Sequence, residues 1–103
     1  MLTGYVKLAS TKDVEPNSMK RFVAKDQKIL VANVNGSYYA IGDVCMHRGC
    51  QLSDGTLEGE TVICPCHGST YDLKTGDFLR GPTKKGEPRY ELKIENNDIM
   101  INI

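Results

Sequence analysis

The stretch "CPCHGSTYD", Cys64–Asp72, places two cysteines and one histidine within its first four residues. The chain has 103 residues, and only four of them are cysteine and two are histidine. The remaining two cysteines and the other histidine fall in "CMHRGC", Cys45–Cys50. We call Cys45–Cys50 the first window and Cys64–Asp72 the second window. Because every cysteine and histidine lies in one of the two, the windows indicate one shared site.

The segments on either side of the windows favour β-strands. β-branched and aromatic residues, which favour strands, are frequent there. Asn35-Gly36 separates two apolar runs, Ile29–Val34 and Tyr38–Ile41, which is typical of a β-hairpin. Asn96-Asn97-Asp98 separates the alternating segments "YELKIE" and "IMINI" in the same way. The sequence therefore predicts strands at both ends of the chain and no long helix.

The middle of the chain differs in composition from both ends. Residues 43–82 hold six of the ten glycines and all the cysteines and histidines. We therefore expect an all-β fold in a single domain, residues 1–103. An antiparallel β base would come from residues 1–42 and 83–103, with a glycine-rich subdomain, residues 43–82, inserted into it.

The charge and hydropathy of the chain exclude several classes of protein. Thirteen Lys and Arg residues balance thirteen Asp and Glu residues, which argues against a nucleic-acid-binding surface and a polybasic membrane patch. No run of 18 apolar residues is present, so we expect no membrane anchor. The first residues lack the charged and apolar regions of a signal peptide. These features predict a cytoplasmic protein.

The spacing of the windows is that of a metal site with four ligands. Cys45-x-His47 is followed after sixteen residues by Cys64-x-x-His67. Two thiolates and two imidazoles suit a tetrahedral zinc ion. They also suit a [2Fe–2S] cluster with both cysteines on one iron and both histidines on the other.

The distribution of the ligands favours the cluster over zinc. Zinc fingers usually pair cysteine with cysteine, then histidine with histidine on a helix. Here each loop supplies one of each, and the neighbouring Gly49 and Gly68 disfavour a helix. A structural zinc site remains the alternative.

Both windows resemble those of Rieske iron–sulfur proteins, whose patterns are Cys-x-His-x-Gly and Cys-Pro-Cys-His-Gly-Ser. The likeness covers Val44–Pro82 in motif detail and extends loosely to both ends as the β base. It implies the Rieske fold and one [2Fe–2S] cluster. The inner iron would be held by Cys45 and Cys64, and the outer iron by His47 and His67.

The same resemblance implies roles for the other residues of the windows. In Rieske proteins of quinol-oxidising respiratory complexes, cysteines at the positions of Cys50 and Cys66 form a disulfide, which ferredoxins of aromatic-ring dioxygenases usually lack. Such a bond would close a loop of about 17 residues and stabilise the protein by roughly 3 kcal/mol; two free thiols are the alternative. Ser69 would donate to a bridging sulfide and Tyr71 to the sulfur of Cys45. Otherwise Ser69 is a turn residue and Tyr71 a half-buried strand aromatic.

The loops resemble those of respiratory Rieske proteins, but the chain is short and has no expected membrane anchor. In these last two respects it resembles a soluble Rieske-type ferredoxin. No segment is left to build the second iron domain of a catalytic Rieske oxygenase, so we expect no enzyme activity. The predicted function is one-electron transfer from a reductase to a terminal oxygenase or another acceptor. The alternative is the Rieske-like small subunit of an assimilatory nitrite reductase, which the intact ligand set disfavours. The basic residues expected around the tip would face an acidic partner or solvent, namely Arg48, Arg80, Lys84 and Lys85.

Overall fold

The computed structural model describes residues 5–43, 50–66, 68–81 and 86–102. These residues form strands and two short 3₁₀ helices, which confirms the predicted all-β class. The elements are β1 (Tyr5–Ser10), η1 (Thr11–Asp13), β2 (Ser18–Ala24), β3 (Gln27–Val34), β4 (Ser37–Gly42), η2 (Leu52–Asp54), β5 (Thr56–Glu58), β6 (Thr61–Ile63), β7 (Thr70–Asp72), β8 (Phe78–Arg80), β9 (Arg89–Tyr90), β10 (Leu92–Glu95) and β11 (Asp98–Asn102).

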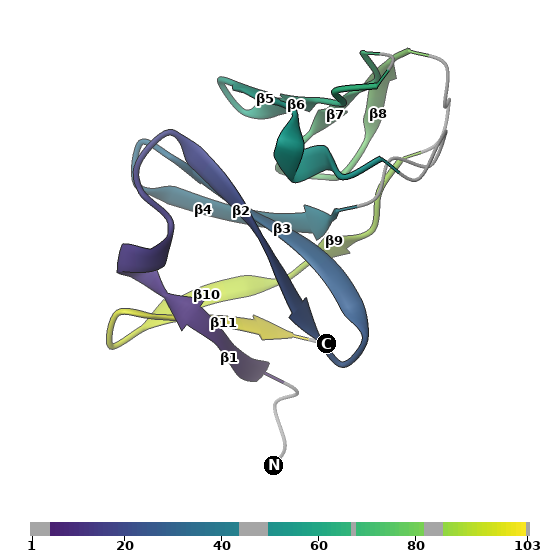
Figure 1. Cartoon of the computed structure of the whole chain (residues 1–103). Helices are drawn as coiled ribbons and strands as arrows, with labels where there is room; N and C mark the ends of the chain where they lie inside the picture. The colour runs from purple at the N-terminus through teal and green to yellow at the C-terminus, as the bar shows by residue number, and fades with distance from the viewer. Residues whose placement is uncertain (1–4, 44–49, 67, 82–85, 103) are drawn as a thin grey trace.

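The strands make three antiparallel sheets, which lie over one another in Figure 1. The first sheet has the order β1-β11-β10, the middle sheet β2-β3-β4-β9, and the third sheet β5-β6-β7-β8. Neighbours in the third sheet are consecutive along the chain, whereas β1 pairs with β11 and β4 pairs with β9. The third sheet is therefore local in sequence, and the other two join distant parts of the chain.

Two predicted hairpins are present. Asn35 and Gly36 link β3 to β4 with φ angles of 52° and 93°, and positive φ at both central residues matches the right-handed twist of the strands. Asn96 and Asn97 link β10 to β11 with φ angles of 54° and 66°. The second turn is shorter than expected, because Asp98 already belongs to β11.

Strand β3 is covered on both faces, which explains why all but one of the residues from Ile29 to Val34 are apolar. Ile29 and Val31 pack in a core between the first and middle sheets, together with Ile99 and Ile101. Alternate residues Leu30, Ala32 and Val34 pack in a second core with Leu52, Val62, Cys64, Tyr71 and Leu73. Each large apolar side chain buried in this way contributes about 1.5–3 kcal/mol. The second core holds the third sheet against the middle sheet.

The inserted segment is more regular than the sequence predicts. Within the expected glycine-rich loops, the structure has four three-residue strands, β5 to β8, with Val62 opposite Tyr71 in the β6–β7 ladder. Three residues are too few for a period of two to stand out in a sequence. The glycine-rich composition reflects the turns between these strands.

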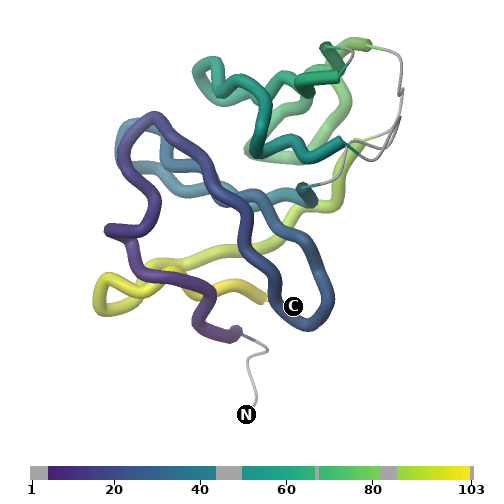
Figure 2. The backbone as a smooth tube through the Cα atoms, in the orientation of Figure 1, coloured from purple at the N-terminus to yellow at the C-terminus, as the bar shows by residue number. Residues whose placement is uncertain are grey.

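The chain leaves the middle sheet and returns to it at neighbouring points. Gly42, the last residue of β4, donates its N–H to the carbonyl of Pro88 at 2.9 Å, immediately before β9. The tube in Figure 2 shows the strands of the third sheet lying to one side of the other two sheets. Because Gly42 and Pro88 are hydrogen-bonded to each other, the chain leaves the middle sheet and returns to it at points that lie close together.

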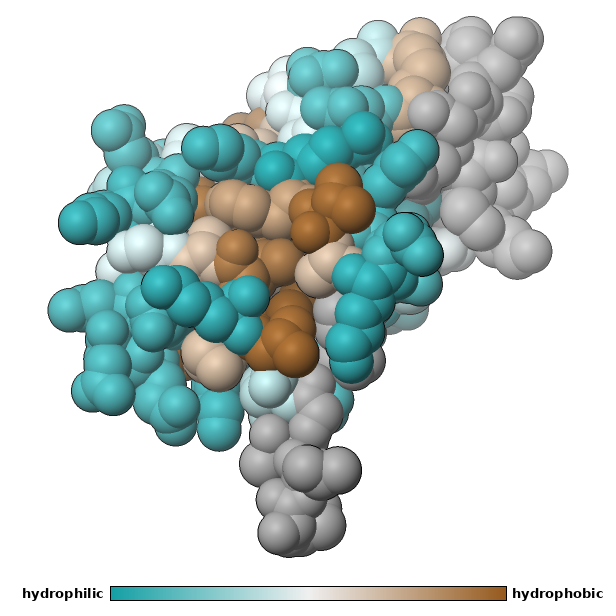
Figure 3. All heavy atoms as spheres, turned by 60° about the horizontal axis from the view of Figure 1, so that its bottom comes forward, coloured by the Kyte–Doolittle hydropathy of each residue, from teal (hydrophilic) through white to brown (hydrophobic). Residues whose placement is uncertain are grey.

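Hydrophobic side chains gather on the face of the molecule drawn in Figure 3, where hydrophilic residues border them. Among the described residues, the large apolar side chains with the greatest exposure are Val23 on β2, Leu79 on β8 and Ile94 on β10. No helix in the described ranges is long and apolar enough to cross a membrane.

Candidate metal centre

The structure describes part of the predicted site. Five of the predicted residues are described, namely Cys50, Cys64, Cys66, Ser69 and Tyr71. Cys64 and Tyr71 lie in the second core and Cys50 packs against it, whereas Ser69 is buried and Cys66 is exposed. The other predicted ligands, Cys45, His47 and His67, lie outside the described residues. The arrangement of the four ligands therefore stays a prediction.

A tight turn between β6 and β7 carries the second window. Cys64 donates its N–H to the carbonyl of Ser69 at 2.7 Å, and Gly68 donates to the carbonyl of Cys64 at 3.2 Å. Cys64 is buried, with 2% of its surface exposed, whereas Cys66 is exposed. The turn thus presents one cysteine to the core and the other to solvent.

A disulfide between Cys50 and Cys66 joins the two windows, as the resemblance implies. The two Cα atoms are 6.5 Å apart, within the usual range for a disulfide. The Sγ atoms of Cys50, Cys64 and Cys66 all lie within 4.8 Å of one another. The disulfide therefore holds Cys50, the last residue of the first window, close to the buried Cys64.

Ser69 has a buried hydroxyl that meets no acceptor. The residue has no exposed surface, and its Oγ has no hydrogen-bond partner among the described residues. A buried hydroxyl without a partner lowers the stability of the fold by about 1–3 kcal/mol. Such a hydroxyl is therefore expected where a bound group supplies the missing acceptor. Sulfide atoms can accept this hydrogen bond. The buried thiol of Cys64 and the unpaired hydroxyl of Ser69 therefore fit an iron–sulfur cluster.

Tyr71 is fully buried in β7, so the expectation of a half-buried strand aromatic is wrong. Its ring packs edge-to-face on Phe78, with 6.3 Å between the ring centroids and an interplanar angle of 72°. A buried tyrosine hydroxyl usually has a hydrogen-bond partner. The partner that the resemblance implies, Cys45, lies outside the described residues.

A buried carboxylate, Asp43, ties three elements together two residues before the first window begins. Asp43 has no exposed surface and accepts hydrogen bonds from Arg21 Nε at 2.7 Å and from the N–H and Oγ of Ser53, each at 2.7 Å. Arg21 Nη2 also donates to the Asp43 carbonyl at 3.2 Å. β2, the end of β4 and η2 therefore meet at Asp43. Sequence analysis missed this network because partners 22 and 10 residues away leave no periodic signal.

A second polar contact joins the middle and third sheets at the surface. Tyr39 on β4 donates to Glu60 Oε2 at 3.0 Å, and Lys74 Nζ lies 3.0 Å from Glu60 Oε1. The hydrogen bonds from Lys74 and Tyr39 hold the pKa of Glu60 below its usual value. The hydrogen bond to Glu60, followed by burial, raises the pKa of Tyr39. Exposed ion pairs add little stability, so this contact mainly orients the sheets.

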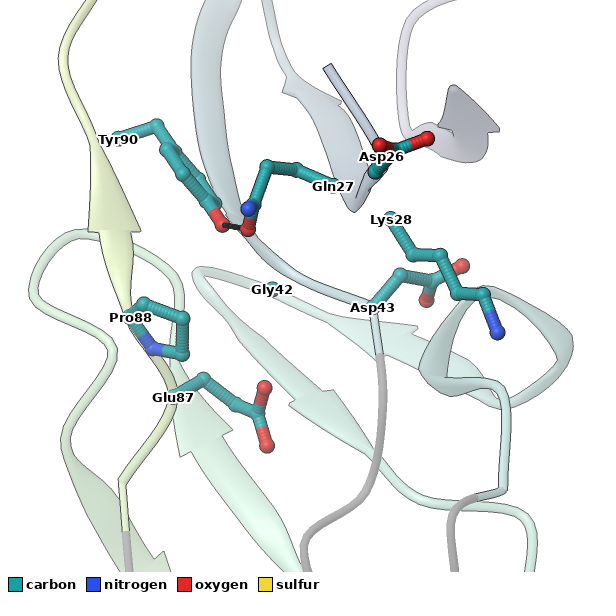
Figure 4. A pocket seen from close by; sticks show the side chains of 8 residues that line it. All are labelled: Asp26, Gln27, Lys28, Gly42, Asp43, Glu87, Pro88 and Tyr90. Carbon is teal, nitrogen blue, oxygen red and sulfur yellow. Dashed lines mark hydrogen bonds between the residues drawn. The ribbon is translucent and has the colours of Figure 1, made fainter. Parts of the chain in front are cut away.

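A pocket of about 280 Å³ lies beside Gly42 and Pro88, as Figure 4 shows. Tyr90 donates to Gln27 Oε1 at 3.1 Å along its wall. Burial, and then the charge of Glu87, raises the pKa of Tyr90. The lining residues are Asp26, Gln27, Lys28, Gly42, Asp43, Glu87, Pro88 and Tyr90. None is a cysteine or histidine, so the pocket is distinct from the sulfur site.

Gly81 offers a test of how closely Ser69 is enclosed. Its φ is +120°, and a Cβ at this position would lie 2.5 Å from Ser69 Cα and 2.7 Å from Ser69 Oγ. We expect Gly81→Ala to lower the free energy of unfolding by about 2–3 kcal/mol, through backbone strain and overpacking together. Urea denaturation measures the change.

Gly36→Ala is the matched control for Gly81→Ala. Gly36 also has a positive φ, +93°, but a Cβ there would meet nothing within 4 Å. It should cost about 1 kcal/mol, from the backbone conformation alone. Equal losses in the two variants would contradict close packing of Gly81 on Ser69.

Known proteins resemble this chain over most of its length. The Rieske [2Fe-2S] domain family matches residues 4–93. The ferredoxin component of biphenyl 2,3-dioxygenase from Rhodococcus jostii (strain RHA1) is 32% identical over 97 residues, covering 94% of this chain and 91% of that protein. The ferredoxin subunit of 3-phenylpropionate/cinnamic acid dioxygenase from Shigella boydii serotype 4 (strain Sb227) is 40% identical over 76 residues, covering 73% and 72%.

Solved structures agree with the fold. A chain in the complex of reduced oxygenase and oxidized ferredoxin of carbazole 1,9a-dioxygenase has a TM-score of 0.88 at 25% identity, covering 98% of this chain and 94% of that chain. The ferredoxin of carbazole 1,9a-dioxygenase from Nocardioides aromaticivorans IC177 has a TM-score of 0.89 at 23% identity, covering 94% and 95%. The match of residues 4–93, together with the relatives at 32% and 40% identity, shows that the chain belongs to the Rieske [2Fe-2S] domain family and takes one [2Fe–2S] cluster.

Proposed function

We propose that the protein is the ferredoxin of an oxygenase system, a one-electron carrier that takes electrons from a reductase and delivers them to a terminal oxygenase. The observation that carries this function is the similarity, over nearly the whole length of both chains, to a ferredoxin component of a dioxygenase. A ferredoxin component is an electron carrier, in agreement with this proposal. The similarity favours the carrier over the nitrite reductase subunit.

We propose that Cys45 and Cys64 hold the inner iron and that His47 and His67 hold the outer iron. The burial of Cys64 beside the unpaired hydroxyl of Ser69 supports its part of this assignment. When bound, a cluster held by these residues would supply a centre that takes up and releases one electron. The chain's own contribution is to keep Cys64 away from water and to fix the two windows through the disulfide.

We also propose the division into a base, residues 1–42 and 83–103, and a cluster-binding subdomain, residues 43–82. Strands β5 to β8 all fall inside the proposed subdomain, and the strands of the other two sheets all fall outside it. A cytoplasmic location, where a reductase and an oxygenase are both available, is part of the same proposal.

Purified protein from iron-replete cells tests the function directly. We expect about two irons and two acid-labile sulfides per chain. The reductase of a biphenyl dioxygenase system, supplied with its nicotinamide donor, should bleach the visible absorption. Adding the matching oxygenase should then restore it. Stoichiometric zinc, or a cluster that no oxygenase-system reductase reduces, would overturn the proposal.

The exposed Arg80 is one of the basic residues that could contact an acidic redox partner. It is exposed at the end of β8, while Arg48, Lys84 and Lys85 lie outside the described residues. If these residues meet an acidic partner, the rate of reduction should fall as ionic strength rises. If the rate of reduction does not depend on salt, these basic residues are solvated surface charges and do not contact the partner.

Ser69→Ala should lower the reduction potential without removing iron. A hydrogen bond to sulfur stabilises the more negative, reduced cluster more than the oxidised one. A bond of about 1 kcal/mol corresponds to roughly 40 mV for a one-electron couple. Protein-film voltammetry measures the shift, and iron analysis checks that the site stays loaded. An unchanged potential would show that the Ser69 hydroxyl is not a donor to the cluster.

A further inference from the structure

Asp43 and Ser53 close the segment of the chain that contains the first window. The N–H of Ser53 donates to Asp43 Oδ1 and its hydroxyl donates to Asp43 Oδ2, each at 2.7 Å. The two residues are ten positions apart, and Cys45–Cys50 lies between them in the sequence. Hydrogen bonds to a carboxylate are stronger than those between neutral groups. A segment closed in this way has fewer conformations open to it than the same segment with free ends.

The Asp43 end of this segment is fixed to the middle sheet. The Asp43 N–H donates to the carbonyl of Lys28 on β3 at 3.0 Å. From β2, Arg21 donates to the Asp43 carboxylate at 2.7 Å and to the Asp43 carbonyl at 3.2 Å. The carboxylate has no exposed surface, so turning it away from Ser53 and Arg21 would leave a buried charge without its partners. Both the backbone and the side chain of Asp43 are therefore held in place.

The Ser53 end is fixed to the third sheet. Leu52, which precedes Ser53 in η2, has no exposed surface and packs in the second core together with Val62 of β6. Gly55 donates its N–H to the carbonyl of Leu52 at 2.8 Å, and a Cβ at Gly55 would collide with the carbonyl of Ile63 on β6. The backbone that follows Ser53 therefore lies directly against β6. The two bonds from Ser53 to Asp43 join the middle sheet to the third sheet at the ends of the first window.

We propose that Ser53 is a positioning residue for the [2Fe–2S] cluster and acts on the first window from both ends. Asp43 lies two residues before the proposed ligand Cys45. Cys50 lies three residues before Ser53 and is joined to the second window by the disulfide. Groups that do not themselves bind a metal can hold its ligands in the required orientation, and their loss typically weakens metal binding by about 10–100-fold. The inference rests on the proposed role of Cys45 and His47 as ligands.

Ser53→Ala tests the positioning role in the loaded protein. The change deletes the hydroxyl that bonds to Asp43 Oδ2 and leaves the bond from the N–H in place, so the fold should persist with a looser closure. We expect the variant to lose iron to a chelator about tenfold faster than the original chain. The electron paramagnetic resonance spectrum of its reduced cluster should broaden, because the ligands are held less uniformly. Ser53→Thr keeps a hydroxyl and should restore both properties.

Ser18→Ala is the matched control, because it deletes a serine hydroxyl that takes no part in the closure. The Ser18 hydroxyl donates to the carbonyl of Glu15 at 2.6 Å. Urea denaturation should show a loss of stability in both alanine variants, whereas the rate of iron loss and the spectrum should change only in Ser53→Ala. The proposal fails if Ser53→Ala matches the original chain in both properties, or if Ser18→Ala changes them equally.

Hydrogen exchange of the unmodified chain tests the closure without any substitution. The groups that close the segment all belong to the chain, so the Ser53 amide should stay protected after the cluster is removed with an iron chelator. We expect its exchange rate to rise by less than about tenfold, measured by mass spectrometry on short peptides that cover Ser53. If the amide then exchanges as fast as in an unfolded peptide, the cluster and not Asp43 orders the segment, and the proposal is wrong.

Two results separate this inference from the proposed function. If the unmodified chain from iron-replete cells carries no iron–sulfur cluster, the proposed function fails and the positioning role fails with it. If the unmodified chain is loaded and is reduced by the reductase of an oxygenase system, but Ser53→Ala keeps its iron as long and gives the same spectrum, only the positioning role is wrong.

Discussion

Asp43→Ala is expected to lower the free energy of unfolding by about 3 kcal/mol, the lower end of the cost of breaking a buried ion pair, because the Arg21 side chain is 27% exposed and stays partly hydrated. The carboxylate has no exposed surface, and it accepts from Arg21 and twice from Ser53. Its removal leaves the Ser53 N–H without its acceptor and separates β2 from η2. Since domains of this kind are stable by only about 5–15 kcal/mol in total, urea denaturation should show a large shift of the midpoint.

Asp43→Asn is the matched control. The amide oxygen can still accept one hydrogen bond in the same space, but the charge that pairs with Arg21 is lost. We expect a smaller loss of stability than in Asp43→Ala, together with faster loss of iron, because Asp43 lies only two residues before Cys45, the start of the first window. A stability for Asp43→Ala within about 0.5 kcal/mol of the original chain, the range of ordinary surface substitutions, would contradict the role given to this network.

Cys64→Ser should abolish the cluster while preserving most of the fold. Serine is a poor ligand for iron held among thiolates, so iron and sulfide per chain should fall close to zero in chemical analysis. The core between the first and middle sheets does not include Cys64, so the far-ultraviolet circular dichroism of the base should persist. Full iron content in this variant would exclude Cys64 as a ligand.

Cys50→Ala/Cys66→Ala is the control for that experiment, because it removes two cysteines that are not proposed ligands. The purified variant should contain iron but lose it faster than the original chain, since the disulfide no longer joins the two windows. If it is as empty as Cys64→Ser, the disulfide is required for assembly of the cluster and not only for its retention.

The sequence predicted most reliably those features that depend on a few neighbouring residues with distinctive conformational or chemical properties. Asn35-Gly36 predicted the β3–β4 hairpin because few residues other than asparagine and glycine adopt positive φ readily. The two windows predicted the sulfur site because cysteine and histidine are rare in this chain. The resemblance then supplied the disulfide, which spacing alone does not dictate.

Other features depend on contacts between segments that carry no pattern of their own. The pairing of β1 with β11 joins the two ends of the described chain, and neither strand indicates the other as its partner. Strands β5 to β8 are too short to reveal alternation. The Asp43 network and the burial of Tyr71 follow from how the sheets stack, so they become visible only in three dimensions.

The pairing of β1 with β11 also has a consequence for biosynthesis. Tyr5 lies opposite Asn102, so during synthesis β1 can pair with β11 only after all the strands between them have left the ribosome. The neighbouring strands β5 to β8 can pair much earlier, because their contacts are local. A nascent chain would therefore offer a formed β6–β7 turn, with its cysteines, while β1 still lacks its neighbour. Insertion of iron and sulfur need not wait for closure of the base.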